Sequence, residues 1–180
     1  MTIMIRNNEH GSTMVELLAA ALMTVIIGGA ALDFYVTQHK SWMIESEVAE
    51  VQQNARVALD VIADALKMGG YQLPAGHPGF RITDDSITVY YRDEATATVD
   101  TVGYFISTSN PRVPTLMVWD KNSSAEPLAE YIEDLTVTRL SPRLLQVSVI
   151  GRAQDRDSVL VAGDGYRRRT YSTRVKLRNI

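Results

Sequence analysis

Cysteine is absent from the 180 residues, so the chain holds together without disulfides and cysteine usage does not indicate its compartment. A strong charge of one sign is also lacking. The formal net charge is −3, which predicts neither a nucleic-acid partner nor a polybasic membrane patch. No internal repeat and no low-complexity tract interrupts the chain. Hydrophobic residues make up 46% and charged residues 22%, an ordinary globular composition that leaves room for one modest domain.

Recognisable catalytic motifs are lacking as well. His10, His39 and His77 have no partner residues at a spacing typical of a catalytic or metal site. The chain contains no phosphate-binding loop, no Ser-His-Asp order and no paired carboxylates in a supporting context. We therefore expect no enzymatic activity and no cofactor.

The most prominent feature that is present is an apolar run near the N-terminus. From Met14 to Leu32 it is interrupted only by Glu16, one threonine and two glycines. A hydrocarbon core of about 30 Å requires about 20 helical residues, so residues 12–32 are long enough to span it. A carboxylate in such a segment costs about 2.5–3.5 kcal/mol, which marks Glu16 as a functional candidate. The alternative is a plain membrane anchor that tolerates one acidic residue near its end.

A specific pattern surrounds this carboxylate. The sequence Gly11-Ser12-Thr13-Met14-Val15-Glu16-Leu17 resembles the processing motif of type IV prepilins and of type II secretion pseudopilins. In that family a prepilin peptidase cuts after the glycine and N-methylates the new first residue, and the fifth mature residue is Glu. The resemblance therefore implies a leader at residues 1–11, cleavage after Gly11, N-methylation of Ser12 and an assembly role for Glu16.

The resemblance also implies a physical role for Glu16. Cleavage would create an ammonium group at Ser12, and this group would neutralise the carboxylate of a neighbouring subunit where water is scarce. Removing one partner of such a buried pair leaves an unpaired charge that costs about 3–5 kcal/mol. The pair would therefore select the register in which a subunit enters a growing filament.

Residues 42–68 predict an amphipathic helix, because apolar residues recur every three or four positions and charged residues occupy the opposite face. Gly69-Gly70 follows as a stop signal. We expect one nearly unbroken helix from about Ser12 to Met68, with residues 12–36 as its transmembrane and assembly part and residues 37–70 continuing into a globular domain. The predicted core-facing stripe is Ile44, Val48, Val51, Ala55, Leu59, Ile62 and Leu66.

Residues 71–180 predict an antiparallel sheet domain. Apolar and polar residues alternate in five short runs, which is typical of strands with one wet face, and a sixth run is apolar on both faces. The alternating runs lie at residues 86–91, 102–106, 135–138, 145–149 and 171–178, and the apolar run lies at residues 116–119. Turn signals lie at Asn110-Pro111, Lys121–Ser124 and Ser141-Pro142. We expect an α+β, pilin-like fold in which the apolar face of the sheet packs on the helix.

Residues 154–169 predict a long polar loop before the final strand. Asp155, Asp157 and Asp164 in this segment carry the oxygen ligands that calcium prefers, but their spacing differs from that of an EF-hand. A solvated acidic loop is the favoured interpretation, and no metal site is assigned. Arg167-Arg168-Arg169 is expected to flank a strand edge, where charge discourages unwanted pairing.

Two further segments indicate which members of this family the chain resembles most. The runs at residues 52–60 and 66–71 are similar to those of PilW-type minor pilins and of the related J-type pseudopilins, and residues 169–179 resemble the last strand of PilW-type proteins. The resemblance implies a minor pilin that is inserted in the inner membrane, with its C-terminal domain extracytoplasmic, and that helps to initiate a pilus and form its tip.

The partners implied are other minor pilins, the major pilin, the prepilin peptidase and the inner-membrane assembly platform. A J-type pseudopilin of type II secretion is one alternative. A membrane-anchored extracytoplasmic binding module that never polymerises is the other.

Overall fold

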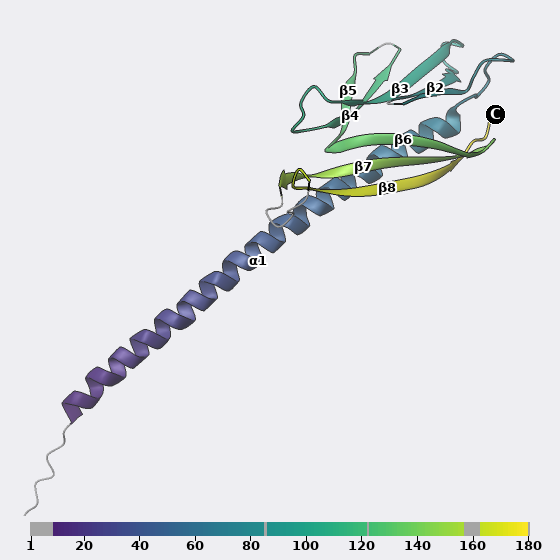
Figure 1. The fold of residues 1–180 in the computed structure, drawn as a ribbon. Coiled ribbons are helices and arrows are strands. Elements are labelled where there is room, and N and C mark those ends of the chain that lie inside the picture. Colours follow the sequence, from purple (N-terminus) through teal and green to yellow (C-terminus); the bar gives the residue numbers. More distant parts are fainter. Residues whose placement is uncertain (1–8, 85, 122, 157–162, 180) are drawn as a thin grey trace, which may run out of the picture. The chain divides into compact units, whose positions relative to one another are not determined.

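The computed structural model describes residues 9–84, 86–121, 123–156 and 163–179. The chain divides into two compact units, residues 1–45 and residues 46–180, and each is described by itself. One helix, α1 (Glu9–Met68), contributes to both units (Figure 1). The expected long helix is therefore confirmed. It begins three residues before Ser12, so the last residues of the expected leader are already helical.

The first unit consists of the N-terminal part of α1. Every side chain described from Thr13 to Glu45 is exposed. Its most apolar stretch has a mean hydropathy of 2.1, and none of that stretch is buried within the protein. By length and composition this part of the helix can cross a membrane.

The second unit contains the rest of α1, which buries one face. The predicted stripe is confirmed from Val51 onwards, since Val51, Ala55, Leu59, Ile62 and Leu66 are all buried. The expectation for Ile44 is wrong, because this residue lies in the first unit and is 37% exposed. The opposite face of the helix carries charged side chains, as a helix on the surface of a domain requires.

Helix α1 ends at Met68, as the glycine pair predicts. Gly69 donates the last helical hydrogen bond, to the carbonyl of Ala65 at 3.1 Å. Gly70 then has a φ of 84°, a left-handed conformation that side-chain-bearing residues rarely adopt. The Asn179 amide also donates a hydrogen bond to the Lys67 carbonyl, so the end of the helix is tied to the C-terminal segment.

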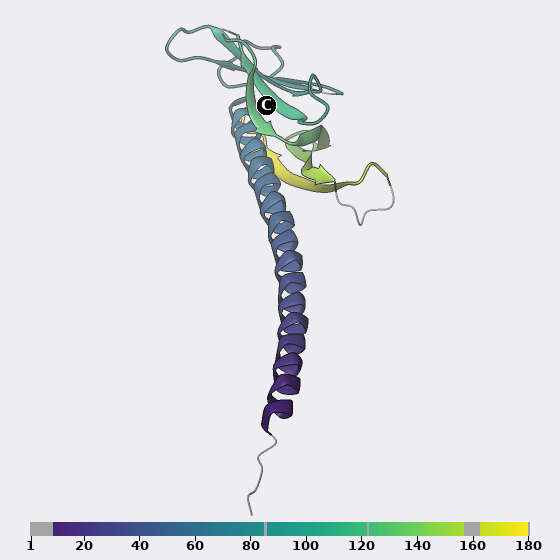
Figure 2. The same ribbon diagram turned by 90° about the vertical axis from the view of Figure 1, so that its left-hand side faces the viewer.

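Eight strands form two antiparallel sheets among the described residues, whereas a single sheet of about six strands was expected (Figures 1 and 2). The larger sheet has the order β1-β2-β3-β4-β5 and the smaller the order β6-β7-β8. Between the sheets, Tyr131 has a φ of 60°, and this turn redirects the chain from β5 to β6. The strands are β1 (Phe80–Thr83), β2 (Ser86–Arg92), β3 (Val99–Ser107), β4 (Thr115–Asp120), β5 (Glu126–Glu130), β6 (Ile132–Ser141), β7 (Leu144–Arg156) and β8 (Tyr166–Lys176).

Two strands were not predicted, and the bounds of the loop expected at residues 154–169 are wrong at both ends. Strands β1 and β5 are short and largely exposed, so neither has the alternation that marks a half-buried strand. The polar residues after Gln154 continue β7 as far as Arg156, which pairs with Tyr166 of β8. Residues 157–162, including Asp157, lie outside the described residues. The turns at Asn110 and at Pro142 are confirmed.

One hydrophobic core joins the buried helix face to both sheets. The five-stranded sheet contributes Ile87, Val89 and Tyr104, and the three-stranded sheet contributes Leu145, Val147 and Val149. Burial raises the pKa of the Tyr104 hydroxyl to about 12. Figure 2 shows the smaller sheet lying alongside the C-terminal part of α1. The prediction of an α+β domain with a helix packed on antiparallel strands is thus confirmed.

Candidate assembly site

Helix α1 places the three predicted site residues within its first two turns. Gly11 and Ser12 have helical backbones, and Glu16 follows Ser12 by four residues. Residues four apart lie on the same helix face, one turn from each other. The Glu16 side chain is exposed, so the geometry leaves it accessible to another molecule at the level of Ser12.

A continuous apolar surface surrounds Glu16. Val15 and Leu17 on either side of it are 66% and 70% exposed, and the other large apolar side chains as far as Tyr35 are exposed to a similar degree. Monomeric soluble proteins rarely expose contiguous apolar patches larger than a few hundred Å². This surface therefore requires a cover, either lipid or the helices of other subunits.

The small and polar residues within this apolar surface can also be covered by lipid or by another helix. The Thr24 hydroxyl donates a hydrogen bond of 2.8 Å to the Ala20 carbonyl, so it does not need water. A methyl group added at Gly28 or at Gly29 would meet no atom within 4 Å. Both glycines are thus open to close approach by another helix, and α1 continues through them without a break.

Aromatic rings mark the end of the apolar surface. Tyr35, His39 and Trp42 stack along one face of α1, with ring centroids 6.1 and 6.3 Å apart. Tyrosine and tryptophan are enriched at membrane–water interfaces because one end of each side chain is apolar and the other is polar. Tyr35 lies two residues beyond Asp33, where an apolar span ending at Leu32 would reach the interface.

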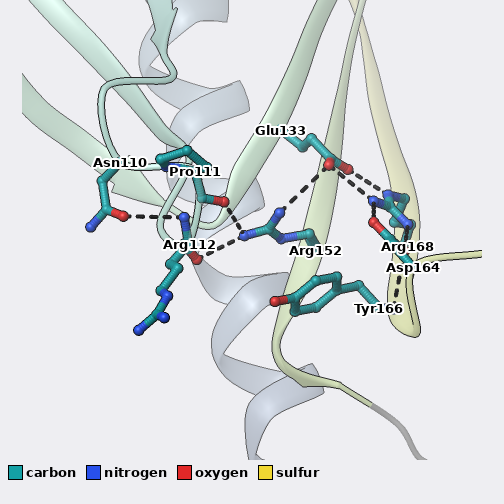
Figure 3. Close-up of polar contacts among 8 residues, drawn as sticks. All are labelled: Asn110, Pro111, Arg112, Glu133, Arg152, Asp164, Tyr166 and Arg168. Carbon is teal, nitrogen blue, oxygen red and sulfur yellow. Dashed lines mark hydrogen bonds and ion pairs between the residues drawn. The ribbon is translucent and has the colours of Figure 1, made fainter.

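The second unit contains a polar cluster that the sequence did not predict (Figure 3). Arg152 of β7 is the one buried charged side chain among the residues that the structure describes. Its guanidinium donates hydrogen bonds to the carbonyls of Pro111 and Arg112, at 2.9 and 2.7 Å, and lies 4.4 Å from the centre of the Tyr166 ring. Because Pro111 precedes β4 of the larger sheet, Arg152 joins the two sheets.

Acidic residues extend this cluster. Glu133 of β6 lies 3.7 Å from the Arg152 guanidinium and also accepts hydrogen bonds from Arg168. Arg168 pairs with Asp164 as well, and its hydrogen bonds hold the pKa of the Asp164 carboxyl well below its usual range. The same contacts raise the pKa of Arg168. These ion pairs and hydrogen bonds tie β6, β7 and β8 together, so the cluster is suited to fixing structure.

Of the residues considered for calcium, the two that the structure describes, Asp155 and Asp164, have different neighbours. Asp164 is occupied by Arg168, and Asp155 lies beside Glu47 of α1, whose pKa is raised by burial and by this neighbouring carboxylate. No group of three or more His, Asp or Glu side chains suited to a metal ion occurs in the part of the chain that the structure describes.

No family model matches this chain, and no curated protein or solved structure is found to be similar to it. The function is therefore inferred from the residues and from their geometry.

Proposed function

We propose that this protein is an assembly subunit of a type IV pilus-like filament, most similar in design to PilW-type minor pilins. In this proposal the peptide bond after Gly11 is cleaved and Ser12 is N-methylated. The mature helix is held in the inner membrane until it packs into the filament. Glu16 then neutralises the N-terminal ammonium of a neighbouring subunit. The protein acts by assembly and has no catalytic role.

One observation carries the proposal. Between Ser12 and Leu32 the apolar part of helix α1 has one carboxylate, Glu16, four residues after Ser12, and the helix continues into an amphipathic stretch that packs on a sheet domain. A simple anchor needs only the apolar surface. A carboxylate within an apolar span is a functional candidate, and the new amine at Ser12 of a neighbouring subunit would supply an opposite charge for it.

The position of the aromatic stack agrees with this arrangement. With residues 12–32 in the bilayer, Tyr35 would lie at the extracytoplasmic interface and residues 46–180 would lie beyond it. The partners proposed are other minor pilins, the major pilin, the prepilin peptidase and the assembly platform. A J-type pseudopilin would use the same contacts in a type II secretion system, and the genes beside this one would distinguish the two machines.

Mass spectrometry of the N-terminus tests the proposal. The full chain is expressed in membranes with and without a prepilin peptidase, and Gly11→Val serves as a variant that resists cleavage. We expect a mature chain that begins with N-methylated Ser12, produced only when the peptidase is present and Gly11 is intact. An unprocessed chain in the presence of an active peptidase would refute the proposal and leave the non-polymerising membrane-anchored module as the better interpretation.

A further inference from the structure

The second unit has a surface hollow lined almost entirely by cations. It lies where the ends of α1 and β8 meet the turn between β6 and β7 (Figure 1). Its volume of about 530 Å³ is typical of a site for a small ligand. The lining residues are Lys67, Arg143, Arg174, Lys176, Arg178 and one apolar residue, Leu177. We call this surface the basic hollow.

Little within the chain compensates the charge of the basic hollow. Lys67 pairs with Asp64, its nitrogen lying 2.7 Å from the carboxylate. For the other four cations, the structure records no side-chain ion pair or hydrogen bond with a described residue, and all four are exposed. No acidic side chain lines the hollow. Because like charges gathered in one place repel each other, a bound anion would stabilise this surface.

Strand β8 fixes the spacing of two of the cations. Arg174 and Lys176 lie two residues apart on this strand, which is paired with β7 on either side of them. Both therefore point to the same face of β8, about 7 Å apart. Val175 between them is buried in the core on the other face, so it anchors the strand beneath the hollow.

Backbone hydrogen bonds hold the other parts of the hollow together. The Leu177 amide donates to the Arg143 carbonyl at 2.9 Å, which places the turn between β6 and β7 beside the segment after β8. The Asn179 side chain donates to the Lys67 carbonyl at 3.2 Å and ties the end of α1 to the same segment. The single chain thus forms the hollow without a ligand, and a preformed site reduces the ordering cost of binding.

The lining favours phosphate groups as the anion. Guanidinium groups bind phosphate in bidentate fashion, and lysines bind it as point charges. A phosphate monoester carries about 1.5–2 negative charges at pH 7, so two such groups would balance the four cations that have no partner among the described residues. No aromatic ring lines the hollow, so it offers no stacking surface for a nucleobase.

We propose that the basic hollow binds an anion that carries two or more phosphate groups. Soluble chains of linked phosphates and phosphorylated lipid headgroups both have this chemistry, and the same cations would contact either one. The hollow lies wholly within residues 46–180 and includes none of Gly11, Ser12 and Glu16. Binding here is therefore independent of the proposed assembly function, which is measured by cleavage after Gly11.

Isothermal titration calorimetry of the full chain in nonionic detergent micelles tests this site. The probes are orthophosphate, pyrophosphate and tripolyphosphate, and citrate is the control that carries carboxylates and no phosphate. We expect the affinity to rise from orthophosphate to tripolyphosphate, to exceed that for citrate, and to fall as salt is added. Equal affinities for citrate and tripolyphosphate, or no saturable binding of tripolyphosphate, would overturn the proposal.

Substitutions then assign the binding to the basic hollow. Arg174→Gln with Lys176→Gln should weaken tripolyphosphate binding at least about tenfold, because two charge-assisted contacts are lost. Arg174→Lys with Lys176→Arg keeps both charges and should restore most of the affinity. Arg178→Gln, outside the strands, should weaken binding in the same direction.

The matched control is Arg81→Gln with Arg92→Gln, which removes two exposed cations from the larger sheet. This variant should bind tripolyphosphate as the wild type does. Circular dichroism should show the same fold for every variant, since all the substituted side chains are exposed. Equal losses of affinity in the two glutamine pairs would overturn the site and indicate a general attraction of anions to the chain.

Inositol trisphosphate, the soluble form of a phosphorylated lipid headgroup, distinguishes the two sources. Tighter binding of this probe than of tripolyphosphate would assign the hollow to a headgroup, and the reverse would assign it to a soluble phosphate chain; either result supports the proposal. Polyglutamate and a single-stranded oligothymidine are the remaining probes. Binding of either one that tripolyphosphate does not displace would overturn the proposal, in favour of an acidic peptide or a nucleic acid respectively.

Discussion

Gly151 of β7 faces Val51 of α1 so closely that a methyl group built on Gly151 would lie 2.4 Å from Val51 Cγ1. The helix can approach the strand here only because one side chain is missing. This contact lies in the unit formed by residues 46–180, beside the buried core residues Ala55 and Val149.

Replacement of Gly151 by alanine should therefore destabilise the domain by about 1–3 kcal/mol, the usual cost of overpacking a core. Denaturant unfolding in detergent, followed by circular dichroism, measures the change. Val51→Ala should relieve the clash, so the double variant should be more stable than the sum of the two single changes predicts. Strict additivity of the two substitutions would contradict the close contact.

Arg152 provides a second prediction, because its guanidinium donates two hydrogen bonds from the smaller sheet to the segment that precedes β4 of the larger sheet. Arg152→Met would leave the carbonyls of Pro111 and Arg112 without this donor and should cost about 3 kcal/mol. Arg152→Lys keeps the positive charge but lacks the planar guanidinium group, so it should be more stable than Arg152→Met and less stable than the wild type. Arg156→Met is the control, since Arg156 is exposed and lies 5.3 Å from the Tyr166 ring. Equal unfolding midpoints for the methionine variants at positions 152 and 156 would contradict the sheet-joining role.

The fold was predictable from the sequence where the pattern is local. The stripe from Val51 to Leu66 follows the helical period, and the pair Gly69-Gly70 supplies the left-handed stop that the structure contains at Gly70. Strand β2 and the first part of β7 bury alternate residues and were therefore recognisable. In each case the physical constraint acts between residues only a few positions apart.

The features of the fold that were not predicted depend on contacts between residues far apart in the sequence, which no local pattern encodes. The division into two sheets is set by the turn at Tyr131, a residue type that rarely adopts a positive φ. The burial of Arg152 depends on carbonyls about 40 residues away along the chain. The sequence did not indicate this burial, because the alternation of buried residues in β7 from Leu145 to Gly151 places Arg152 on the opposite, wet face of the strand. For the candidate assembly site, the resemblance of residues 11–17 to a prepilin processing motif predicted Gly11, Ser12 and Glu16, and the pairing proposed between Ser12 and Glu16 would require a second molecule.

The ion pair between Asp164 and Arg168 predicts a response to acid. The hydrogen bonds from Arg168 lower the pKa of Asp164 below its ordinary value of 3.8, so the pair stabilises the fold fully when the pH is above that value. The contribution is lost as the pH falls towards the folded-state pKa. In Asp164→Asn the unfolding free energy should therefore depend less steeply on pH between about 5 and 2. An unchanged slope, measured by denaturant unfolding across this range, would show that the pair does not form in solution.

Glu47 should respond in the opposite direction. Burial and the neighbouring Asp155 raise its pKa, so its charged form is disfavoured in the folded protein. The group favours folding when it is protonated, and this benefit is lost as the pH rises above 4.5 through the folded-state pKa. Glu47→Gln should therefore raise the unfolding midpoint at pH 7 and have little effect at pH 3. A lower midpoint at pH 7 would indicate that the Glu47 carboxylate makes a favourable contact instead.

The last prediction concerns Glu16, whose exposed side chain interrupts the apolar surface of α1. Glu16→Gln should leave membrane insertion intact, because it removes a charge from an apolar segment. Incorporation into filaments should fall by at least about tenfold, since an ammonium without its carboxylate costs about 3–5 kcal/mol where water is scarce. Membrane fractionation and immunogold counting of filaments measure the two steps separately. Asp33→Asn, the next carboxylate along α1, is the control and should assemble normally. Incorporation of Glu16→Gln into filaments at the wild-type level would contradict the charge-pairing role. It would not bear on cleavage after Gly11, which is measured separately.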